Sequence, residues 1–220
     1  MQQKKTAIIL GATGLTGSYL LQELLADEGY EKIKVFTRKS LGFTHPKLVE
    51  FQVDLFRLTE EKEDFTGDEV FCCVGSTKKK TPNNEVYEKV DVGIPSVAAK
   101  LAKENNIGTF IVISALGADT GSRFFYNQIK GKMEALVLQQ NIKHTYILRP
   151  SLISGKRKEK RTLEFIWNQL MKVANLFMMG PLKKFKSIPA INIAKAMIVL
   201  ANSPQSESII ESEEINRIGI

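Results

Sequence analysis

Cysteine is scarce in this sequence. Its 220 residues include two cysteines, Cys72 and Cys73, which are adjacent in an apolar run. Adjacent residues of a strand point to opposite faces of a sheet, so a disulfide between them is not expected. The two histidines, His45 and His144, are isolated in the sequence, so no metal site is expected either. We expect both cysteines to be reduced residues of a buried strand, without a redox or metal role.

Long hydrophobic runs are also missing. No stretch approaches the roughly 18 uninterrupted apolar residues that indicate a membrane-spanning helix. The apolar run near the N-terminus covers residues 7–10 and stops at Gly11, so it is too short for the core of a signal peptide. We therefore expect a soluble, intracellular protein, located in the cytoplasm, that has no membrane partner.

Nucleic-acid-binding signatures are absent, although the chain is basic. Its 31 Lys and Arg against 24 Asp and Glu give a net charge of +7. The basic clusters at residues 156–161 and 183–186 have no interleaved aromatic residues and belong to no helix-turn-helix or metal motif. A basic surface also suits an anionic phosphate ligand. We therefore predict no nucleic-acid partner.

What the sequence does contain is an alternation of short apolar runs with longer stretches of helical periodicity. Such an alternation is typical of a parallel α/β sheet. The expected strands cover residues 6–10, 33–37, 48–53, 69–74, 109–114 and 145–148. The expected helices cover residues 15–27, 85–105 with a bend at 93–95, and 124–140, whereas residues 60–64 are expected to form a weak helix or a loop. We predict a doubly wound parallel sheet, the Rossmann fold.

The pattern changes after Pro150. A charged loop at residues 155–161 precedes an apolar helical stretch at 163–179, which we expect to shape or cover a substrate pocket. A further helix is expected at residues 192–201, with Asn192 as its N-cap, and a short final strand at 208–212. The chain has no repeats and no low-complexity linker. We predict a single domain over residues 1–220, in which residues 151–220 form a small helical elaboration on the substrate side.

Three regularly spaced glycines, Gly11, Gly14 and Gly17, lie between the first strand and the first helix. In this context the first glycine permits a tight turn and the second lets the backbone approach a pyrophosphate. The third lets the helix pack closely on the strand. Free N–H groups and the helix dipole favour an anion at the same place. The turn predicts a dinucleotide site. A merely structural turn is the alternative, and the further strand–helix units argue against it.

The residues after the second strand bear on which dinucleotide binds. NAD-selective sites usually place Asp or Glu about 20 residues beyond the glycine motif, where it holds the ribose hydroxyls. The corresponding position here is Thr37, followed by Arg38 and Lys39. A basic pair attracts a 2′-phosphate, so we predict NADP(H); the alternative is two solvated loop charges. Asp54, after the third strand, lies where its side chain could reach the adenine amino group.

A serine, a tyrosine and a lysine indicate what a bound dinucleotide could do. Tyr126 and Lys130 are four residues apart in a helical stretch, so they share a helix face, and Ser114 ends the fifth strand. A phenol can protonate the developing alkoxide of a carbonyl reduction, but its ordinary pKa of about 10 is a poor match for neutral pH. We expect the Lys130 ammonium to lower the pKa of Tyr126 and to hold the nicotinamide ribose. Ser114 would hydrogen-bond the substrate oxygen. The alternative is an exposed tyrosine that happens to lie beside a lysine.

Together these features resemble the short-chain dehydrogenase/reductase superfamily, in its atypical branch. The similarity is closer still to the Tat-interacting protein and metastasis-suppressor group of NADPH-dependent oxidoreductases, and it spans nearly the whole chain. The segments that carry it are residues 71–77, 126–134, 148–150 and 187–189.

The resemblance implies a Rossmann fold that binds NADP(H) and transfers a hydride to or from a small carbonyl or alcohol. The residues it assigns to catalysis are Ser114, Tyr126 and Lys130. The residues it assigns to the cofactor, together with the motif positions above, are Gly11, Thr13, Gly14, Leu15, Thr16, Gly17, Arg38, Lys39, Asp54, Leu55, Cys73, Val74, Gly75, Tyr126, Lys130 and Pro150.

One position departs from the family pattern. Catalytic members carry an Asn upstream of the serine, which holds a water of the proton relay. Here Asp91 lies near that position, and no Asn clearly corresponds. Related members also include cofactor-binding regulators with little or no turnover. The alternative to an enzyme is therefore an NADP(H)-binding redox sensor that docks a protein partner. Monomer and homodimer both remain open.

Overall fold

The apolar runs and periodic stretches of the sequence become strands and helices in alternation. The computed structural model describes residues 4–155 and 186–220. Its strands are β1 (Lys5–Leu10), β2 (Tyr30–Thr37), β3 (Leu48–Gln52), β4 (Glu69–Cys72), β5 (Thr109–Ile113), β6 (His144–Arg149), β7 (Ile153–Ser154), β8 (Ile188–Pro189) and β9 (Ile209–Glu211). Its helices are α1 (Leu15–Ala26), the 3-10 helix η1 (Leu55–Glu61), α2 (Asn84–Glu88), the π-helical turn η2 (Lys89–Gly93), α3 (Ile94–Glu104), α4 (Phe125–Leu138), α6 (Ala190–Asn202) and α7 (Ser212–Ile218).

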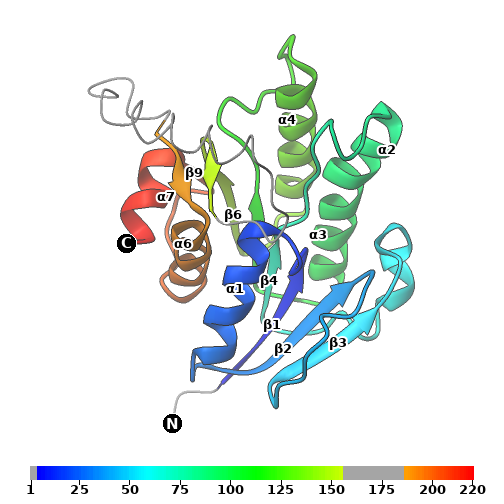
Figure 1. Cartoon of the computed structure of the whole chain (residues 1–220), viewed down its shortest axis with the longest axis vertical. Coiled ribbons are helices and arrows are strands. Elements are labelled where there is room, and N and C mark those ends of the chain that lie inside the picture. Colours follow the sequence, from blue (N-terminus) through cyan, green and yellow to red (C-terminus); the bar gives the residue numbers. More distant parts are fainter. Residues whose placement is uncertain (1–3, 156–185) are drawn as a thin grey trace.

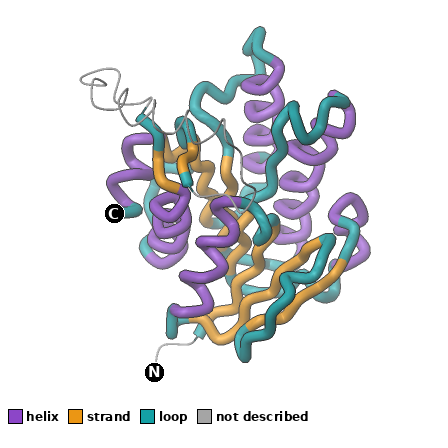
Figure 2. The backbone as a smooth tube through the Cα atoms, viewed as in Figure 1, coloured by secondary structure: helices purple, strands orange, loops and turns teal. Residues whose placement is uncertain are grey.

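One parallel sheet organises these elements. Seven strands pair in the order β3-β2-β1-β4-β5-β6-β9, and every neighbouring pair is parallel. Helices cover both faces of the sheet (Figure 1, Figure 2). The predicted doubly wound Rossmann fold is therefore confirmed.

Two apolar layers hold the helices on the sheet. Because side chains of a strand alternate between its faces, β1 sends Ile8 and Leu10 into one layer and Ala7 and Ile9 into the other. The first layer packs beneath α3 and α4, and the second packs beneath α1 and α6 (Figure 1). Ile215 adds α7 to the second layer.

The direction in which strands are added reverses at β1. The chain runs outward from β1 to β2 and β3, then crosses to β4 on the other side of β1 and continues to β5 and β6. In open α/β sheets, ligands bind outside the carboxyl ends of the strands at such a reversal. The loops that follow β1 and β4 therefore border the expected binding crevice.

Most of the predicted strands are confirmed, with shifted ends. The second strand begins at Tyr30 rather than at residue 33, and the Tyr30 hydroxyl donates a 2.6 Å hydrogen bond to the buried Glu69 carboxylate. The short final strand is β9, which pairs with β6. The helical stretch predicted at residues 85–105 is present, and its irregularity is the π-helical turn η2, which ends at Gly93, the first residue of the predicted bend.

The predicted N-cap Asn192 is wrong. Helix α6 begins at Ala190, directly after Pro189, so Asn192 lies inside the first turn. Its side-chain amide donates a 3.1 Å hydrogen bond to Asn216 of α7. A tertiary contact between two helices therefore takes the amide that the local pattern assigned to capping. The predicted loop at 156–161 and the predicted helix at 163–179 lie outside the described residues.

The glycine turn is the tightest contact between the first strand and its neighbours. Gly11 has a φ of +82°, a conformation that glycine adopts without steric cost. A Cβ on Gly11 would lie 2.7 Å from the carbonyl carbon of Cys73, and one on Gly17 would lie 2.2 Å from the Gly11 oxygen. A Cβ on Gly14 would approach that same oxygen only to 3.2 Å. The first and third glycines are thus required by packing, whereas the second is not.

These distances predict opposite outcomes for two alanine substitutions. Gly17→Ala forces backbone apart and should lower the free energy of unfolding by about 3 kcal/mol. Gly14→Ala, at a φ of −75°, should change it by less than about 1 kcal/mol. Urea unfolding of both variants without added dinucleotide measures the difference. If Gly17→Ala lowered the free energy of unfolding no more than Gly14→Ala is expected to, the backbone contact at Gly17 would not require a glycine.

Candidate active site

The glycine turn leaves the N-terminus of α1 open to a ligand. Gly14 is the N-cap of α1, and no side chain caps this helix end. The Gly14 N–H itself donates to the Gly11 carbonyl at 3.0 Å, whereas Thr13 and Gly14 are exposed. Backbone N–H groups of the first helical turn are therefore available to an anion, and the helix dipole favours one. This cradle fits the pyrophosphate of a dinucleotide.

The end of β4 lies directly against this turn. The Cys73 N–H donates to the Leu10 carbonyl at 2.8 Å, and the Cys73–Val74 backbone lies where a Cβ of Gly11 would be. Gly75 follows as an exposed residue. The structure thus brings the predicted residues of the first and fourth strands together at one edge of the sheet.

Two basic residues follow β2 on the other side of the glycine turn. Arg38 and Lys39 are exposed, and the Thr37 hydroxyl donates to the Lys39 carbonyl at 3.0 Å, which fixes the turn. Asp54, at the end of the adjacent β3, caps η1 by accepting the Phe56 N–H at 3.0 Å. Among the described residues, no carboxylate pairs with either basic side chain.

Helix α4 carries a polar stripe towards the same edge. Tyr126, Lys130 and Glu134 are each four residues apart on α4, so they share one face. Lys130 and Glu134 are buried, whereas 43 % of Tyr126 is exposed. A cationic and an anionic side chain are therefore buried one turn apart, and each requires a partner.

The partner of Lys130 is Asp91, from the π-helical turn η2. Lys130 Nζ lies 3.0 Å from Asp91 Oδ1, and their side chains are 4 % and 0 % exposed. Asp91 also accepts the Ser76 N–H at 2.8 Å. A Cβ on Gly75 would lie 3.5 Å from Asp91 Oδ1 and 3.7 Å from Lys130 Nζ. The ion pair is therefore packed against the loop that follows β4.

This ion pair sets the protonation of the predicted catalytic residues. Burial lowers the pKa of Lys130, but the carboxylate of Asp91 and the phenol of Tyr126 raise it, and the net shift is upward. Burial raises the pKa of Tyr126, Lys130 lowers it, and Asp91 raises it again, with a net upward shift. Lys130 thus lowers the pKa of Tyr126 in the expected direction, but burial and Asp91 outweigh the ammonium, so the net pKa is not lowered.

Ser114 is engaged elsewhere on the stripe. Its hydroxyl donates a short hydrogen bond to Glu134 Oε1, and Arg149 donates to both oxygens of the same carboxylate, at 3.0 and 2.6 Å. Arg149 also reaches Glu211 at 3.2 Å. This network joins the end of β5 to α4, β6 and β9. The sequence alone does not predict it. Its one local signal is the acid that follows Lys130 by four residues.

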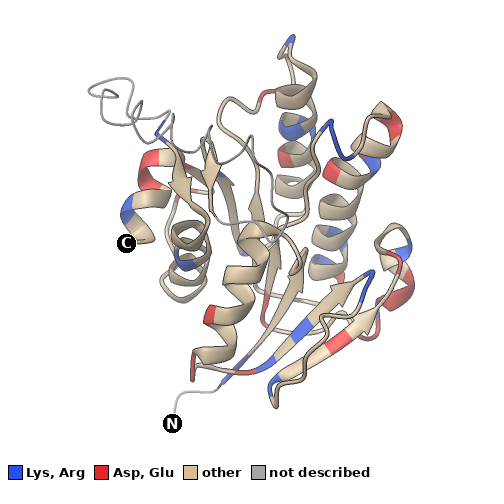
Figure 3. Cartoon of the chain, viewed as in Figure 1, with Lys and Arg blue, Asp and Glu red and all other residues tan. Residues whose placement is uncertain are grey.

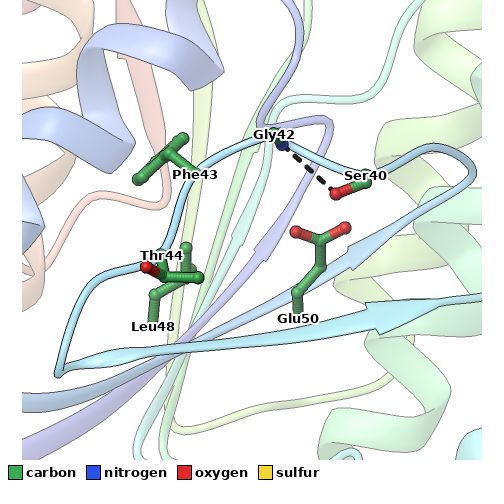
Figure 4. A pocket seen from close by; sticks show the side chains of 6 residues that line it. All are labelled: Ser40, Gly42, Phe43, Thr44, Leu48 and Glu50. Atoms are coloured by element: carbon green, nitrogen blue, oxygen red, sulfur yellow. Dashed lines mark hydrogen bonds between the residues drawn. The ribbon is translucent and has the colours of Figure 1, made fainter.

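Two hollows lie away from this edge. One, of about 600 Å³, is formed by the connection between β2 and β3 (Figure 4) and is lined by Ser40, Gly42, Phe43, Thr44, Leu48 and Glu50. The Glu50 carboxylate accepts the Leu41 N–H there, at 3.1 Å. The other, of about 450 Å³, lies between the α2–η2 segment and α4 and is lined by Glu85, Glu88, Lys89, Val92, Gly93, Lys132 and Leu136. Neither is lined by the glycine turn or by Tyr126, although the first begins at Ser40, directly after Lys39.

Charged residues are spread over the described part of the fold. In the view of Figure 3, basic and acidic residues are interspersed over the elements of the fold. Within residues 4–155 and 186–220, no three His, Cys, Asp or Glu side chains gather as a metal site would require. None of the helices in these ranges combines the length and apolar character of a membrane crossing.

The Glu134 network predicts how two arginine variants differ. Arg149→Met leaves the Glu134 carboxylate buried without its bidentate partner and should lower the free energy of unfolding by about 3 kcal/mol. The matched control is Arg217→Met, because Arg217 lies in solvent beside Glu214, and its loss should leave the free energy of unfolding nearly unchanged. Urea unfolding of both variants measures this. If both variants lost a similar free energy of unfolding, the buried Arg149–Glu134 pair would contribute no more to stability than the exposed pair does.

Known proteins resemble this chain in sequence over nearly its whole length. A family model described as NAD(P)H-binding matches residues 11–204. Protein HTATIP2 of Rattus norvegicus is 30 % identical over 224 residues, which cover 99 % of this chain and 90 % of that protein. The mitochondrial protein FMP52 of Meyerozyma guilliermondii is 32 % identical over 227 residues, which cover 96 % and 94 %.

Solved structures share the fold at lower identity. The enzyme WbmH of Bordetella bronchiseptica, in complex with NAD⁺, superposes with a TM-score of 0.70 at 16 % identity, over 91 % of this chain and 73 % of that one. The UDP-glucuronic acid 4-epimerase of Bacillus cereus, in complex with NAD, gives 0.66 at 16 % identity, over 93 % and 76 %. The chain therefore belongs to the NAD(P)H-binding family of Rossmann-fold proteins and is an atypical short-chain dehydrogenase/reductase that resembles HTATIP2.

Proposed function

We propose that this protein is an NADP(H)-dependent oxidoreductase that transfers a hydride to or from a small carbonyl or alcohol, with Tyr126 as acid/base. The observation that carries the proposal is the position of Lys130. Its ammonium is packed against Gly75 at the dinucleotide edge and lies one helical turn from Tyr126. An ammonium between a cofactor loop and a phenol is what proton transfer beside a bound nicotinamide requires.

The residues of the edge fit the cofactor. The turn from Gly11 to Gly17, with Thr13, Leu15 and Thr16, offers the pyrophosphate a cradle without side-chain caps. The backbone of residues 73–75 and the segment at Pro150 border the nicotinamide half of the crevice, and Asp54 with Leu55 borders the adenosine half. When bound, the cofactor supplies the hydride, and the protein supplies position and a proton.

Tyr126 supplies that proton in the direction of reduction. At neutral pH Tyr126 is a phenol, which is the form that donates, but its raised pKa makes it a weaker acid, so the proposal depends on a positive neighbour that stabilises the phenolate. As the carbonyl carbon gains a hydride, the carbonyl oxygen takes the phenolic proton, and the alcohol leaves. Solvent then returns a proton to the partly exposed Tyr126. Lys130 stabilises the transient phenolate as a positive neighbour and holds the ribose of the nicotinamide.

The preference for a phosphorylated cofactor rests on Arg38 and Lys39. Both are exposed at the end of β2, where NAD-selective sites carry an acid. A guanidinium binds a phosphate through two parallel hydrogen bonds. NADP(H) is therefore proposed over NAD(H), although NAD is the dinucleotide of the solved structures compared above.

A second candidate function is favoured by Ser114. Its only hydroxyl hydrogen is directed to Glu134, so it is not free to polarise a substrate carbonyl in this arrangement. A protein that binds NADP(H) and docks a partner according to the redox state has no need of that donor. This candidate requires a partner affinity that differs between NADP⁺ and NADPH. A partner that binds equally well with both would eliminate it.

The enzyme proposal is tested by Tyr126→Phe. With a panel of small aldehydes and ketones, NADPH consumption by the variant should fall by roughly 10²-fold or more. NADPH affinity should stay within about threefold, because the phenyl ring is kept. Tyr19→Phe, on α1, is the control and should keep full activity. Unchanged turnover in Tyr126→Phe, or no turnover of any carbonyl by the wild type, would contradict the proposal.

A further inference from the structure

The buried carboxylate of Asp91 has no part in the proposed chemistry so far. It lies on a π-helical turn, a rare geometry that occurs mainly as short bulges, frequently at functional sites. Asp91 is completely buried, yet it is one of few charged side chains in the core. A buried charge is retained only when it is paired and hydrogen-bonded. Its Oδ2 accepts the Ser76 N–H, and its Oδ1 lies 3.0 Å from Lys130 Nζ in an ion pair but accepts no well-aligned hydrogen bond from the described residues.

We propose that Asp91 is the positioning residue of the site, whose carboxylate keeps Lys130 an ammonium ion, aimed at the Gly75 backbone, and so preserves the fully protonated Tyr126–Lys130 pair. The consequence for reduction rests on the proposed function, whereas the consequence for cofactor binding requires only that Lys130 contacts the dinucleotide. Asp91 is not a catalytic residue in this scheme, because it acts through Lys130.

Other charged and titratable groups cannot replace Asp91. Within the described residues, the groups that interact with Lys130 are Asp91, Tyr126 and Cys72. Burial raises the pKa of Cys72 to about 11, so its thiol is neutral under ordinary conditions. Tyr87, which interacts with Asp91 and Tyr126, also has a raised pKa because of burial. Asp91 is thus the anion that faces the ammonium.

The position of the carboxylate explains the direction of its effect. Burial by itself favours the neutral amine of Lys130, and the ion pair opposes this. Without the carboxylate, the Tyr126–Lys130 pair gives up its first proton at lower pH, whichever group releases it. The protonated pair is the state that binds the ribose through an ammonium and donates a phenolic proton. Loss of Asp91 should therefore lower the upper pH limit at which the protein binds NADPH and can donate the phenolic proton.

A matched control lies three residues before Asp91, on α2, and pairs with the same helix α4. Glu88, at the end of α2, forms an ion pair with Lys132 of α4. The Glu88–Lys132 pair is thus the exposed counterpart of the buried Asp91–Lys130 pair. The Glu88 side chain is 40 % exposed and that of Lys132 is 54 % exposed. Glu88→Gln removes the same charge as Asp91→Asn, but from a solvated pair whose contribution is small.

The test is the pH dependence of NADPH binding, followed by cofactor fluorescence. Relative to wild type, Asp91→Asn should move the pH at which affinity is lost downward by about one unit or more, and Glu88→Gln should not move it. In a Lys130→Met background, Asp91→Asn should have no further effect on that midpoint. An unmoved or raised midpoint in Asp91→Asn would overturn the proposal.

A second readout needs neither substrate nor cofactor. Tyrosinate absorbance of each protein minus that of its Tyr126→Phe counterpart isolates the titration of Tyr126. Its midpoint should move in Asp91→Asn, downward if Tyr126 releases the first proton of the pair and upward if Lys130 releases it. An unshifted titration contradicts the proposal even if no carbonyl is reduced and no NADPH binds. If Asp91→Asn alone does not fold, Asp91→Asn/Lys130→Met should restore folding, because it leaves no unpaired charge. A double variant that remains unfolded would refute the role of Asp91 as the counter-ion.

Discussion

The close approach of Gly17 to the Gly11 carbonyl, and of Gly11 to the Cys73 backbone, is the constraint on which the rest of the structure depends. It joins β1, α1 and β4 at the point where the order of strands reverses. Since no side chain fits in either contact, the N-terminus of α1 and the end of β4 lie at one edge. At that edge no side chain caps the N-terminus of α1, and we propose that a dinucleotide pyrophosphate binds its N–H groups.

Helix α4 places Tyr126 near this edge and carries two buried charged side chains. Lys130 and Glu134 lie one turn apart, and each is neutralised from a different element, by Asp91 and by Arg149. The first pair lies against Gly75 and Ser76, where we propose that it governs proton transfer. The second takes up Ser114 and ties α4 to β6 and β9. Two ion pairs, one helical turn apart, thus hold α4 against its neighbours. They position Tyr126, which lies in the first turn of the helix.

Much of this could be predicted from sequence, because it depends on local patterns. Apolar runs gave the strands, and the spacing of Tyr126 and Lys130 gave their shared face. Pairings between distant residues could not be predicted: Asp91 meets Lys130 only when η2 packs on α4, and the π-helical turn that directs it has no compositional signal. Asn192 has the local pattern of an N-cap, but its amide bonds to Asn216 instead. The net pKa of Tyr126 likewise depends on burial, which spacing alone does not reveal.

The most direct test of the account is calorimetric titration of NADP⁺ and NAD⁺ into the wild type and Arg38→Ala. We expect one NADP⁺ per chain, bound at least about tenfold more tightly than NAD⁺, since charge-assisted hydrogen bonds to a phosphate contribute about 1.5–3 kcal/mol. Arg38→Ala should remove most of that preference and leave NAD⁺ binding unchanged. Tighter binding of NAD⁺ by the wild type, or no binding of either dinucleotide, would contradict it.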